Sequence, residues 1–267
     1  MTFRELGYLS PLSATWIVRV RGDNRDWFEY TDKLNRLGQR AAFLASADDE
    51  SNREFVSILL FLRALFHFQG VVLLAERGMS IEARSLARGA LEAAFCLKAL
   101  AADEKFLDQL ASADTHHRKV VASALISPSH RQYLDAMNAS QLETFLAELS
   151  SSSSSKTASM KIEQIARMGG LHEIYQTIYR ALSGDASHVS VASLNYYVKE
   201  TESGDSIAVG PVVSAVEIAE ALQAASLSLH ACLDGLTSLL GLSALEAELP
   251  PLRAEYNLLT KQMAQQS

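Results

Sequence analysis

The segment Met79–Ala101 most constrains the fold, because it reads as a helix that is apolar on nearly every side and yet carries charges. Arg84, Arg88 and Glu92 are spaced by four residues, which places them along one side of that helix. A helix that is apolar nearly all round belongs in a protein interior, where an unpaired charge costs several kcal/mol. Arg88 and Glu92 are placed to pair with each other. Arg84 therefore needs a partner from elsewhere in the chain.

The preceding segment, Phe55–Ala75, is even more apolar and carries Arg63 and His67 four residues apart. A run of this length is long enough to span a bilayer, but polar groups near its middle make that costly. We therefore expect a buried core helix and no membrane association. Gly78 suits the C-terminal end of this helix. The two helices should form an antiparallel hairpin that brings Arg63 and His67 alongside the charges of the second helix.

Composition favours an all-α chain, since 48% of its 267 residues are hydrophobic and only five are prolines. We expect a single helical domain over residues 1–267, a multi-helix bundle built around the buried hairpin. Residues 1–22 allow a short strand or an N-terminal arm, and residues 150–158 are a serine-rich stretch typical of a flexible loop. A small β-hairpin is predicted near residues 194–209, from strand formers on either side of a turn signal.

The long helix predicted over residues 211–240, with the C-terminal helix after it, offers more apolar surface than a monomer needs. These helices predict a homodimer. Ser226, His230 and Asp234 lie four apart on the long helix and are interpreted as a polar edge. His116, His117 and His130 are likewise interpreted as surface residues.

Charge and cysteine usage argue against several functions. The formal charge is −7 and no basic cluster suggests DNA binding or general nucleic-acid binding. Cys96 and Cys232 lack metal-ligand spacing, and adjacent histidines such as His116 and His117 point about 100° apart on a helix. No glycine-rich phosphate loop or zinc motif is present, so no metal and no cofactor is expected. The N-terminus lacks the pattern of a signal peptide, which predicts a cytoplasmic location.

Two motifs stand far apart in the chain. The first is Arg84-Ser-Leu-Ala-Arg88-Gly-Ala-Leu-Glu92, and the second is Tyr179-Arg-Ala-Leu-Ser183-Gly-Asp185-Ala-Ser-His188. In their order and separation they resemble a bacterial family of all-helical proteins of unknown function, over roughly residues 55–240. The resemblance implies an all-helical fold and no settled activity.

More distantly, the chain resembles the HEPN superfamily of helical ribonucleases and RNA-associated domains. Those enzymes typically use an arginine followed four to six residues later by a histidine, often assembled across a dimer. Seven residues separate Arg180 from His188, and three separate Arg63 from His67, so neither pair fits. Arg167 and His172 fit with four residues between them, but the intervening Met-Gly-Gly-Leu favours interpreting that match as accidental.

Two functional hypotheses follow, and whether the chain is an enzyme stays open. In the first, it is a HEPN-like RNA-binding or ribonuclease-type protein of defence or toxin biology. His188 or His67 would move the proton and Arg84 or Arg88 would bind the phosphate, with His188 and Arg84 as the catalytic candidates. In the second, it is a non-enzymatic protein-interaction module whose polar centre is structural. Both hypotheses use the same binding or structural centre: Arg63, His67, Arg88, Glu92, Tyr179, Ser183 and Asp185.

Overall fold

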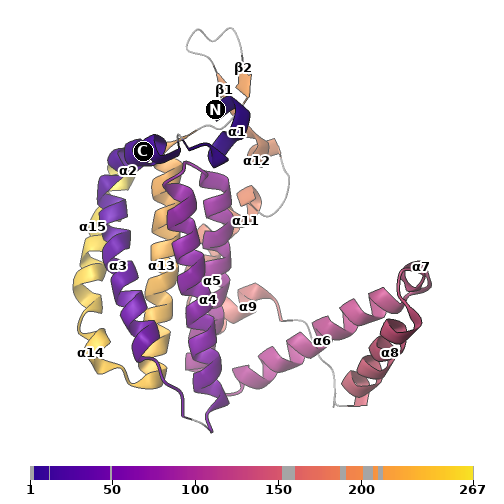
Figure 1. Cartoon of the computed structure of the whole chain (residues 1–267). Helices are drawn as coiled ribbons and strands as arrows, with labels where there is room; N and C mark the ends of the chain where they lie inside the picture. The colour runs from indigo at the N-terminus through magenta and orange to yellow at the C-terminus, as the bar shows by residue number, and fades with distance from the viewer. Residues whose placement is uncertain are drawn as a thin grey trace.

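In the computed structural model, the described residues are 3–11, 13–48, 50–151, 160–186, 191–200, 207–209 and 213–266. They form an all-α protein, as the sequence predicts (Figure 1). The elements in the first half of the chain are α1 (Phe3–Leu6), the 3₁₀ turn η1 (Gly7–Leu9), α2 (Ser13–Asp23), α3 (Arg25–Leu44), α4 (Asn52–Ala75), α5 (Ser80–Ala102), α6 (Phe106–Ile126) and α7 (Pro128–Arg131). Those in the second half are α8 (Ala136–Ser151), α9 (Ile162–Met168), α10 (His172–Ile174), the π-helical turn η2 (Tyr175–Tyr179), α11 (Arg180–Ala186), α12 (Val191–Asn195), α13 (Ala215–Leu240), α14 (Ser243–Glu246) and α15 (Leu249–Gln266).

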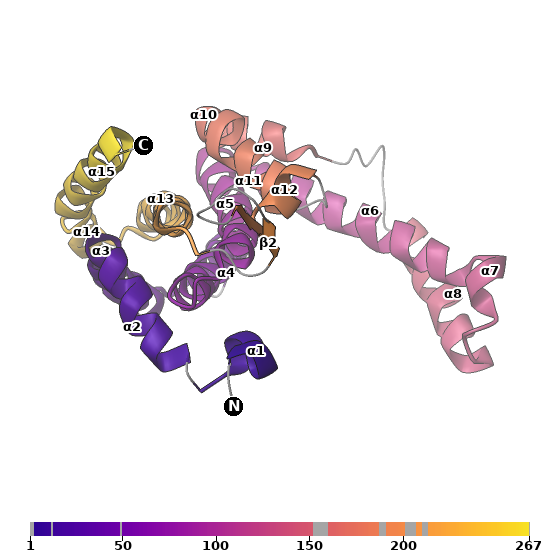
Figure 2. The ribbon, with the colours of Figure 1, turned by 90° about the horizontal axis from the view of Figure 1, so that it is seen from above.

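The bundle is organised around α13. Seen from above, α13 lies between α3 and α15 on one side and α4 and α5 on the other (Figure 2). The core where they meet includes the fully buried side chains Tyr30, Phe61, Phe68, Phe95 and Leu229. A helix in this position is shielded on most sides, so the apolar pattern all round α13 belongs to one chain's own interior. α13 is therefore not the spare apolar surface from which a homodimer was predicted, and the homodimer itself stays a prediction.

The predicted hairpin of α4 and α5 is present, and its turn requires glycine. Gly78 has φ +78°, and a Cβ there would lie 2.7 Å from Val213 Cγ2 and 2.9 Å from Trp16 Nε1. Both the backbone conformation and the space exclude a side chain. Ser80, at the start of α5, donates a hydrogen bond to Glu217 Oε2 at 2.9 Å, so the turn is also tied to α13.

The helix α4 is buried on one side only. Its inner face, with Phe61, Leu65 and Phe68, belongs to the core, while Phe55, Leu59, Phe66 and Leu73 are exposed. Among the described helices it is the one that length and composition would allow to cross a bilayer. Its packing against α5 and α13 accounts for the inner apolar face without a membrane.

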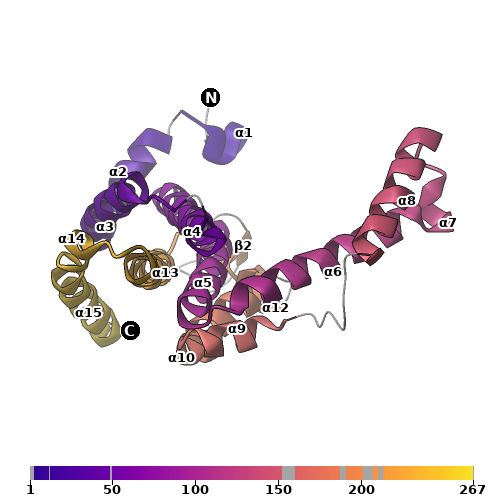
Figure 3. The same ribbon diagram turned by 90° about the horizontal axis from the view of Figure 1, so that it is seen from below.

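An arm formed by α6, α7 and α8 projects away from the bundle (Figures 1 and 3). Pro128 opens α7, and α8 then returns along α6, so the break predicted there is present. Little of the arm is buried beyond Phe106, where it leaves the bundle. Apolar side chains that stay exposed on it are Val120, Val121, Leu125, Tyr133 and Met137.

Two local predictions are corrected by the structure, and a third, the serine-rich loop, lies mostly outside the described residues. The N-terminal residues that allowed a strand form helices α1 and α2 instead. The serine-rich stretch begins inside α8, which continues to Ser151, and residues 152–159 lie outside the described residues. Residues 194–209 begin as the end of α12, and within the described part of this range β1 (Val198–Glu200) and β2 (Ile207–Val209) pair, antiparallel, with Val198 opposite Val209. Two strands of this length leave the class all-α.

Candidate functional site

Four residues from the two sequence motifs meet between α5 and the segment η2–α11. Arg88 Nη2 lies 2.9 Å from Glu92 Oε1 and donates to Tyr179 Oη at 2.8 Å. Arg88 Nε donates to Ser183 Oγ at 3.1 Å. The Tyr179 hydroxyl in turn donates to Glu92 Oε1 at 2.8 Å. We call Arg88, Glu92, Tyr179 and Ser183 the Arg88 network, and it brings these four predicted residues together.

The Arg88 network is partly open to solvent. The Arg88 and Glu92 side chains are 31% and 32% exposed, so this is not the fully buried ion pair that the apolar helix suggested. Burial, with the Glu92 carboxylate beside it, raises the pKa of Tyr179 to about 12. Tyr179 therefore keeps its proton near neutral pH and serves as a donor to Glu92, not as a base. The Arg88 network therefore joins α5 to the segment η2–α11 through hydrogen bonds, and each of its four side chains bonds to another member of the network.

The π-helical turn η2 positions Tyr179. An i→i+5 turn inserts one residue into the helical repeat and shifts the side chains that follow it, and such turns are frequent at functional sites. Here the rings of Tyr175 and Tyr179 stack with centroids 5.2 Å apart, and Phe95 of α5 meets Tyr179 edge-on at 5.6 Å. The Arg88 guanidinium lies 5.0 Å from the Tyr179 ring. The aromatic packing fixes the hydroxyl within reach of Glu92.

Arg84, predicted to be catalytic, makes a different contact. Its Nη1 lies 2.6 Å from Glu220 Oε2 on α13, and its guanidinium lies 5.8 Å from the Tyr196 ring. The Arg84 side chain is almost fully buried. The sequence predicts that Arg84 needs a partner from another segment of the chain, and that partner is Glu220. This ion pair joins α5 to α13, on the same seam as the Ser80–Glu217 hydrogen bond.

Arg63 and His67 both lie on α4, and His67 faces the neighbouring helix α5. A Cβ at Gly89 would come within 2.6 Å of the His67 ring, so the imidazole lies directly against the α5 backbone. Burial and the nearby Arg63 lower the pKa of His67, against smaller opposite effects of the Gly89 backbone and of Glu92. His67 is therefore neutral near pH 7. It approaches the Arg88 network through Glu92, while Arg63 is exposed.

The two remaining residues of the predicted site are Asp185 and His188. Asp185 belongs to α11. His188, the predicted proton-transfer residue, lies outside the described residues.

Sequence reasoning dismissed one pair that the structure brings together. Arg167 Nη2 lies 2.8 Å from His172 Nε2, which is also 3.1 Å from Glu163 Oε1. Gln176 Nε2 is 3.2 Å from the same carboxylate oxygen. We call Glu163, Arg167, His172 and Gln176 the Glu163 cluster. All four side chains reach solvent, and the hydrogen bond from His172 lowers the pKa of Glu163.

The turn between α9 and α10 produces this convergence. Gly170 has φ +72°, and a Cβ at Gly169 would lie 2.8 Å from Lys98 Cβ and 3.0 Å from the Ala99 amide nitrogen. The two glycines let the chain reverse tightly against α5. In the sequence, the Gly169-Gly170 pair indicates a tight turn, and a tight turn brings Arg167 and His172, on either side of it, close together.

A second missed group is buried in the bundle. The Tyr30 hydroxyl is hydrogen-bonded to His230 Nε2, and both side chains are buried beside Tyr256. Interpreting His230 as an edge residue is therefore wrong, because α13 is the central helix. Burial, with Arg253 nearby, lowers the pKa of His230 to about 4. Among the described residues, no group of three histidine, cysteine or carboxylate side chains is placed to hold a metal ion.

These features define an all-helical protein with a hydrogen-bonded charge network between its second hairpin helix and a π-helical turn. The chain belongs to a family of unknown function, DUF5677, whose model matches residues 54–206. That range begins within α4, contains the Arg88 network, the Glu163 cluster and the arm, and ends before α13. No curated protein and no solved structure matches the chain.

Proposed function

We propose that the chain is a non-enzymatic protein-interaction module that pairs with a second copy of itself through the outer face of α4. The observation that carries the proposal is the exposure of four large apolar residues on that face. Phe55, Leu59, Phe66 and Leu73 are 55%, 48%, 60% and 54% exposed. Their spacings of four and seven residues align them in one stripe, which we call the α4 stripe.

The α4 stripe suits a twofold partner. A twofold interface requires a surface that complements its own reversed copy. An antiparallel second α4 places Phe55 near the partner's Leu73 and Phe66 near the partner's Leu62. It also brings Arg77, just after α4, to the acidic start of the partner's α4, where Glu50 is exposed. Apolar contact in the middle and opposite charges at the ends favour this pairing.

The polar centre supports a structural role. In the Arg88 network each polar side chain contacts another, and Arg84 is engaged by Glu220. The Arg88 network and the Arg84–Glu220 ion pair each join helices of the same chain, which is the behaviour expected of charges with a structural role.

Sedimentation or light scattering at several protein concentrations tests the proposal. We expect a mass of twice the 29.1 kDa chain. Phe66→Asp should give the monomer, because it puts a charge in the centre of the interface. The matched control is Phe43→Asp, which changes an exposed phenylalanine on α3, outside the α4 stripe, and should stay dimeric. A monomeric wild-type protein at all concentrations up to about 100 μM, well above the micromolar affinities common for specific interfaces, would overturn it.

A second candidate is a HEPN-like ribonuclease, favoured by the Glu163 cluster. Arg167 and His172 have the spacing that the resemblance asks for, and they meet at the surface. His172 would take the proton of an RNA 2′-hydroxyl. That oxygen would then attack the phosphorus, and the 5′ oxygen would leave with a proton from solvent. Arg167 would stabilise the charge on the phosphate.

Single-stranded RNA incubated with purified protein separates the candidates. His172→Gln should abolish cleavage, and the control His117→Gln, which changes an exposed histidine on the arm, should not. His188→Ala in the same assay tests the residue chosen from the sequence. Absence of cleavage by the wild-type protein would remove this candidate and leave the interaction module standing.

A further inference from the structure

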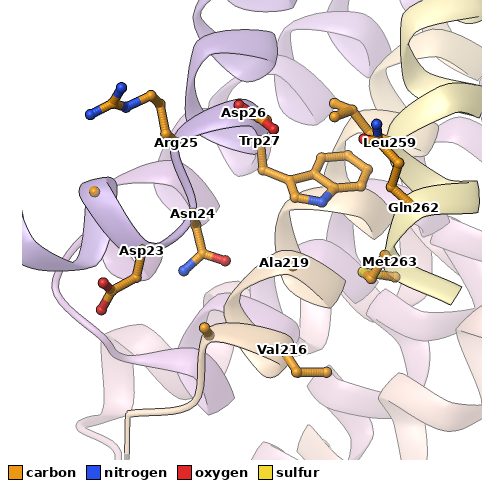
Figure 4. Close-up of a pocket in the computed structure, with 12 residues that line it drawn as sticks. Asp23, Asn24, Arg25, Asp26, Trp27, Val216, Ala219, Leu259, Gln262 and Met263 are labelled. Carbon is orange, nitrogen blue, oxygen red and sulfur yellow. The ribbon is translucent and has the colours of Figure 1, made fainter. Parts of the chain in front are cut away.

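A cavity at one end of the bundle has the features of a small-molecule site. It has a volume of about 310 Å³ and lies where the junction of α2 and α3, the first turns of α13 and the last turns of α15 meet (Figure 4). Its apolar walls come from Val216 and Ala219 of α13 and from Leu259 and Met263 of α15. A volume of this size lies at the lower end of the range typical of ligand pockets.

Trp27 supplies one polar group to this cavity. The side chain is only 6% exposed, and edge-on contacts with Tyr30 at 6.0 Å and Tyr256 at 5.9 Å hold its ring in place. In Figure 4 the indole nitrogen lies on the side of the ring that faces Ala219. Within the described parts of the chain, this N–H has no hydrogen-bond acceptor. The nitrogen is open to the cavity and is not one of the solvent-inaccessible polar atoms without a partner, so the cavity offers an accessible donor at a fixed position.

Asn24 supplies the second polar group. It is the residue between α2 and α3, is 8% exposed, and extends its carboxamide from the junction toward the same space (Figure 4). Its Nδ2 donates to the Val20 carbonyl oxygen at 3.5 Å, and its side chain makes no cap on α3. The carboxamide oxygen is thus left as an acceptor near the Trp27 donor.

The surroundings select against charge in the ligand. Asp23 and Asp26 border the cavity and disfavour an anion, while the positive end of the α13 dipole, at Ala215 and Val216, disfavours a cation. Arg25 also borders it, but its guanidinium points away in Figure 4. A neutral molecule with one donor and one acceptor is disfavoured neither by these carboxylates nor by the helix dipole.

We propose that this cavity binds a small uncharged molecule that carries an amide edge on an apolar or aromatic body. The amide oxygen accepts the hydrogen bond of the Trp27 indole N–H, and the amide N–H donates to the Asn24 carboxamide oxygen. The body of the ligand packs against Ala219, Leu259 and Met263. This binding is independent of the α4 stripe, which lies on another part of the surface.

Proton–nitrogen NMR of the indole groups tests the proposal with three probes that share one ring: benzamide, benzoate and benzylamine. The sequence has two tryptophans, and Trp27→Phe assigns the Trp27 signal. We expect benzamide to shift the Trp27 indole signal downfield and saturably, and benzoate and benzylamine to bind at least ten times more weakly. No saturable shift with benzamide up to about 10 mM, where even millimolar affinity would show, overturns the proposal. Stronger binding of benzoate or benzylamine also overturns it.

A second variant guards against a Trp27→Phe protein that fails to fold. Val216→Phe fills the cavity from a half-exposed wall position and should remove the benzamide shift. Val121→Phe, at a similarly exposed valine on the arm, is the matched control and should leave it unchanged. Equal benzamide binding by wild type and a folded Val216→Phe protein places the ligand elsewhere and overturns the assignment.

Discussion

Arg84 of α5 and Glu220 of α13 form an ion pair, 2.6 Å from Nη1 to Oε2, in which the arginine side chain is 6% exposed and the glutamate 44%. The pair is therefore asymmetric. Water reaches the carboxylate and still solvates it, whereas the guanidinium depends on its protein partners. Removal of the carboxylate leaves a positive charge in a place that water scarcely reaches.

Glu220→Ala should lower the free energy of unfolding by about 1–3 kcal/mol, less than for a fully buried pair because Glu220 is partly solvated. Urea unfolding followed by circular dichroism measures it. Glu29→Ala, at an exposed glutamate on α3, should change the free energy by no more than about 0.5 kcal/mol. Equal midpoints for wild type and Glu220→Ala would show that Arg84 does not need this carboxylate.

Glu92→Ala should lower the free energy of unfolding by about 1–2 kcal/mol. A fully buried pair would cost about 3–5 kcal/mol, but both partners here are about one-third exposed. The loss combines the contact with Arg88 and the hydrogen bond donated by Tyr179. Tyr179→Phe removes only the latter, so its effect should be the smaller of the two. A larger effect of Tyr179→Phe than of Glu92→Ala would mean that the hydroxyl, not the carboxylate, holds the network together.

Stability should fall with pH between about 6.5 and 4 because of His230. The folded state lowers the pKa of this histidine to about 4, whereas an unfolded histidine titrates near 6.5. Above pH 6.5 both states are neutral and the residue has no effect. As pH falls through this window the unfolded state binds a proton that the folded state does not, which favours unfolding by about 3 kcal/mol in total.

The His230→Gln variant isolates this effect, because glutamine still has a polar group for Tyr30 but no proton to gain. Its free energy of unfolding should decline less steeply than that of the wild type over the same pH range. Parallel curves for the two proteins would exclude His230 as the source of the pH dependence.

Gly89 and Gly184 should respond oppositely to alanine. At Gly184, in α11, a Cβ meets no atom within 4 Å, so the gain in helix propensity should stabilise the protein by about 0.5–1 kcal/mol. At Gly89 a Cβ would lie 2.6 Å from the His67 ring, so Gly89→Ala should be destabilising. Thermal unfolding gives both values.

Removal of the His67 imidazole ring tests whether that ring is the cause of the destabilisation expected for Gly89→Ala. In a His67→Ala background the clash is gone, and Gly89→Ala should then stabilise the protein as it does at Gly184. Destabilisation that persists in that background would place the strain in the α5 backbone instead of in the imidazole.

Much of the fold could be predicted because it depends on local patterns. Periodicity located α4 and α5, Gly78 marked their turn, and the spacing of Arg88 and Glu92 gave their contact directly. Tyr179 and Ser183 were found through their motif, although nothing local showed that a π-helical turn would aim them at Arg88.

The errors concern contacts between distant segments. Glu220 is 136 residues from Arg84, and no pattern in either helix specifies the other. α13 is apolar on nearly every side, so its periodicity could not show whether His230 faces the core or solvent. The meeting of Arg167 and His172 depends on the tight turn at Gly169 and Gly170, which their spacing alone does not encode.

The central place of α13 has a consequence for how the chain folds during synthesis. The hairpin of α4 and α5 emerges early from the ribosome, but the helix that covers it follows only after the arm and the segments beyond it, and Ser80 meets Glu217 across 137 positions. Closing so long a loop is slow compared with forming the hairpin. Until then the inner faces of α4 and α5 are uncovered in a nascent chain, so the period of greatest exposure to aggregation ends only when α13 has been synthesised and packs against them.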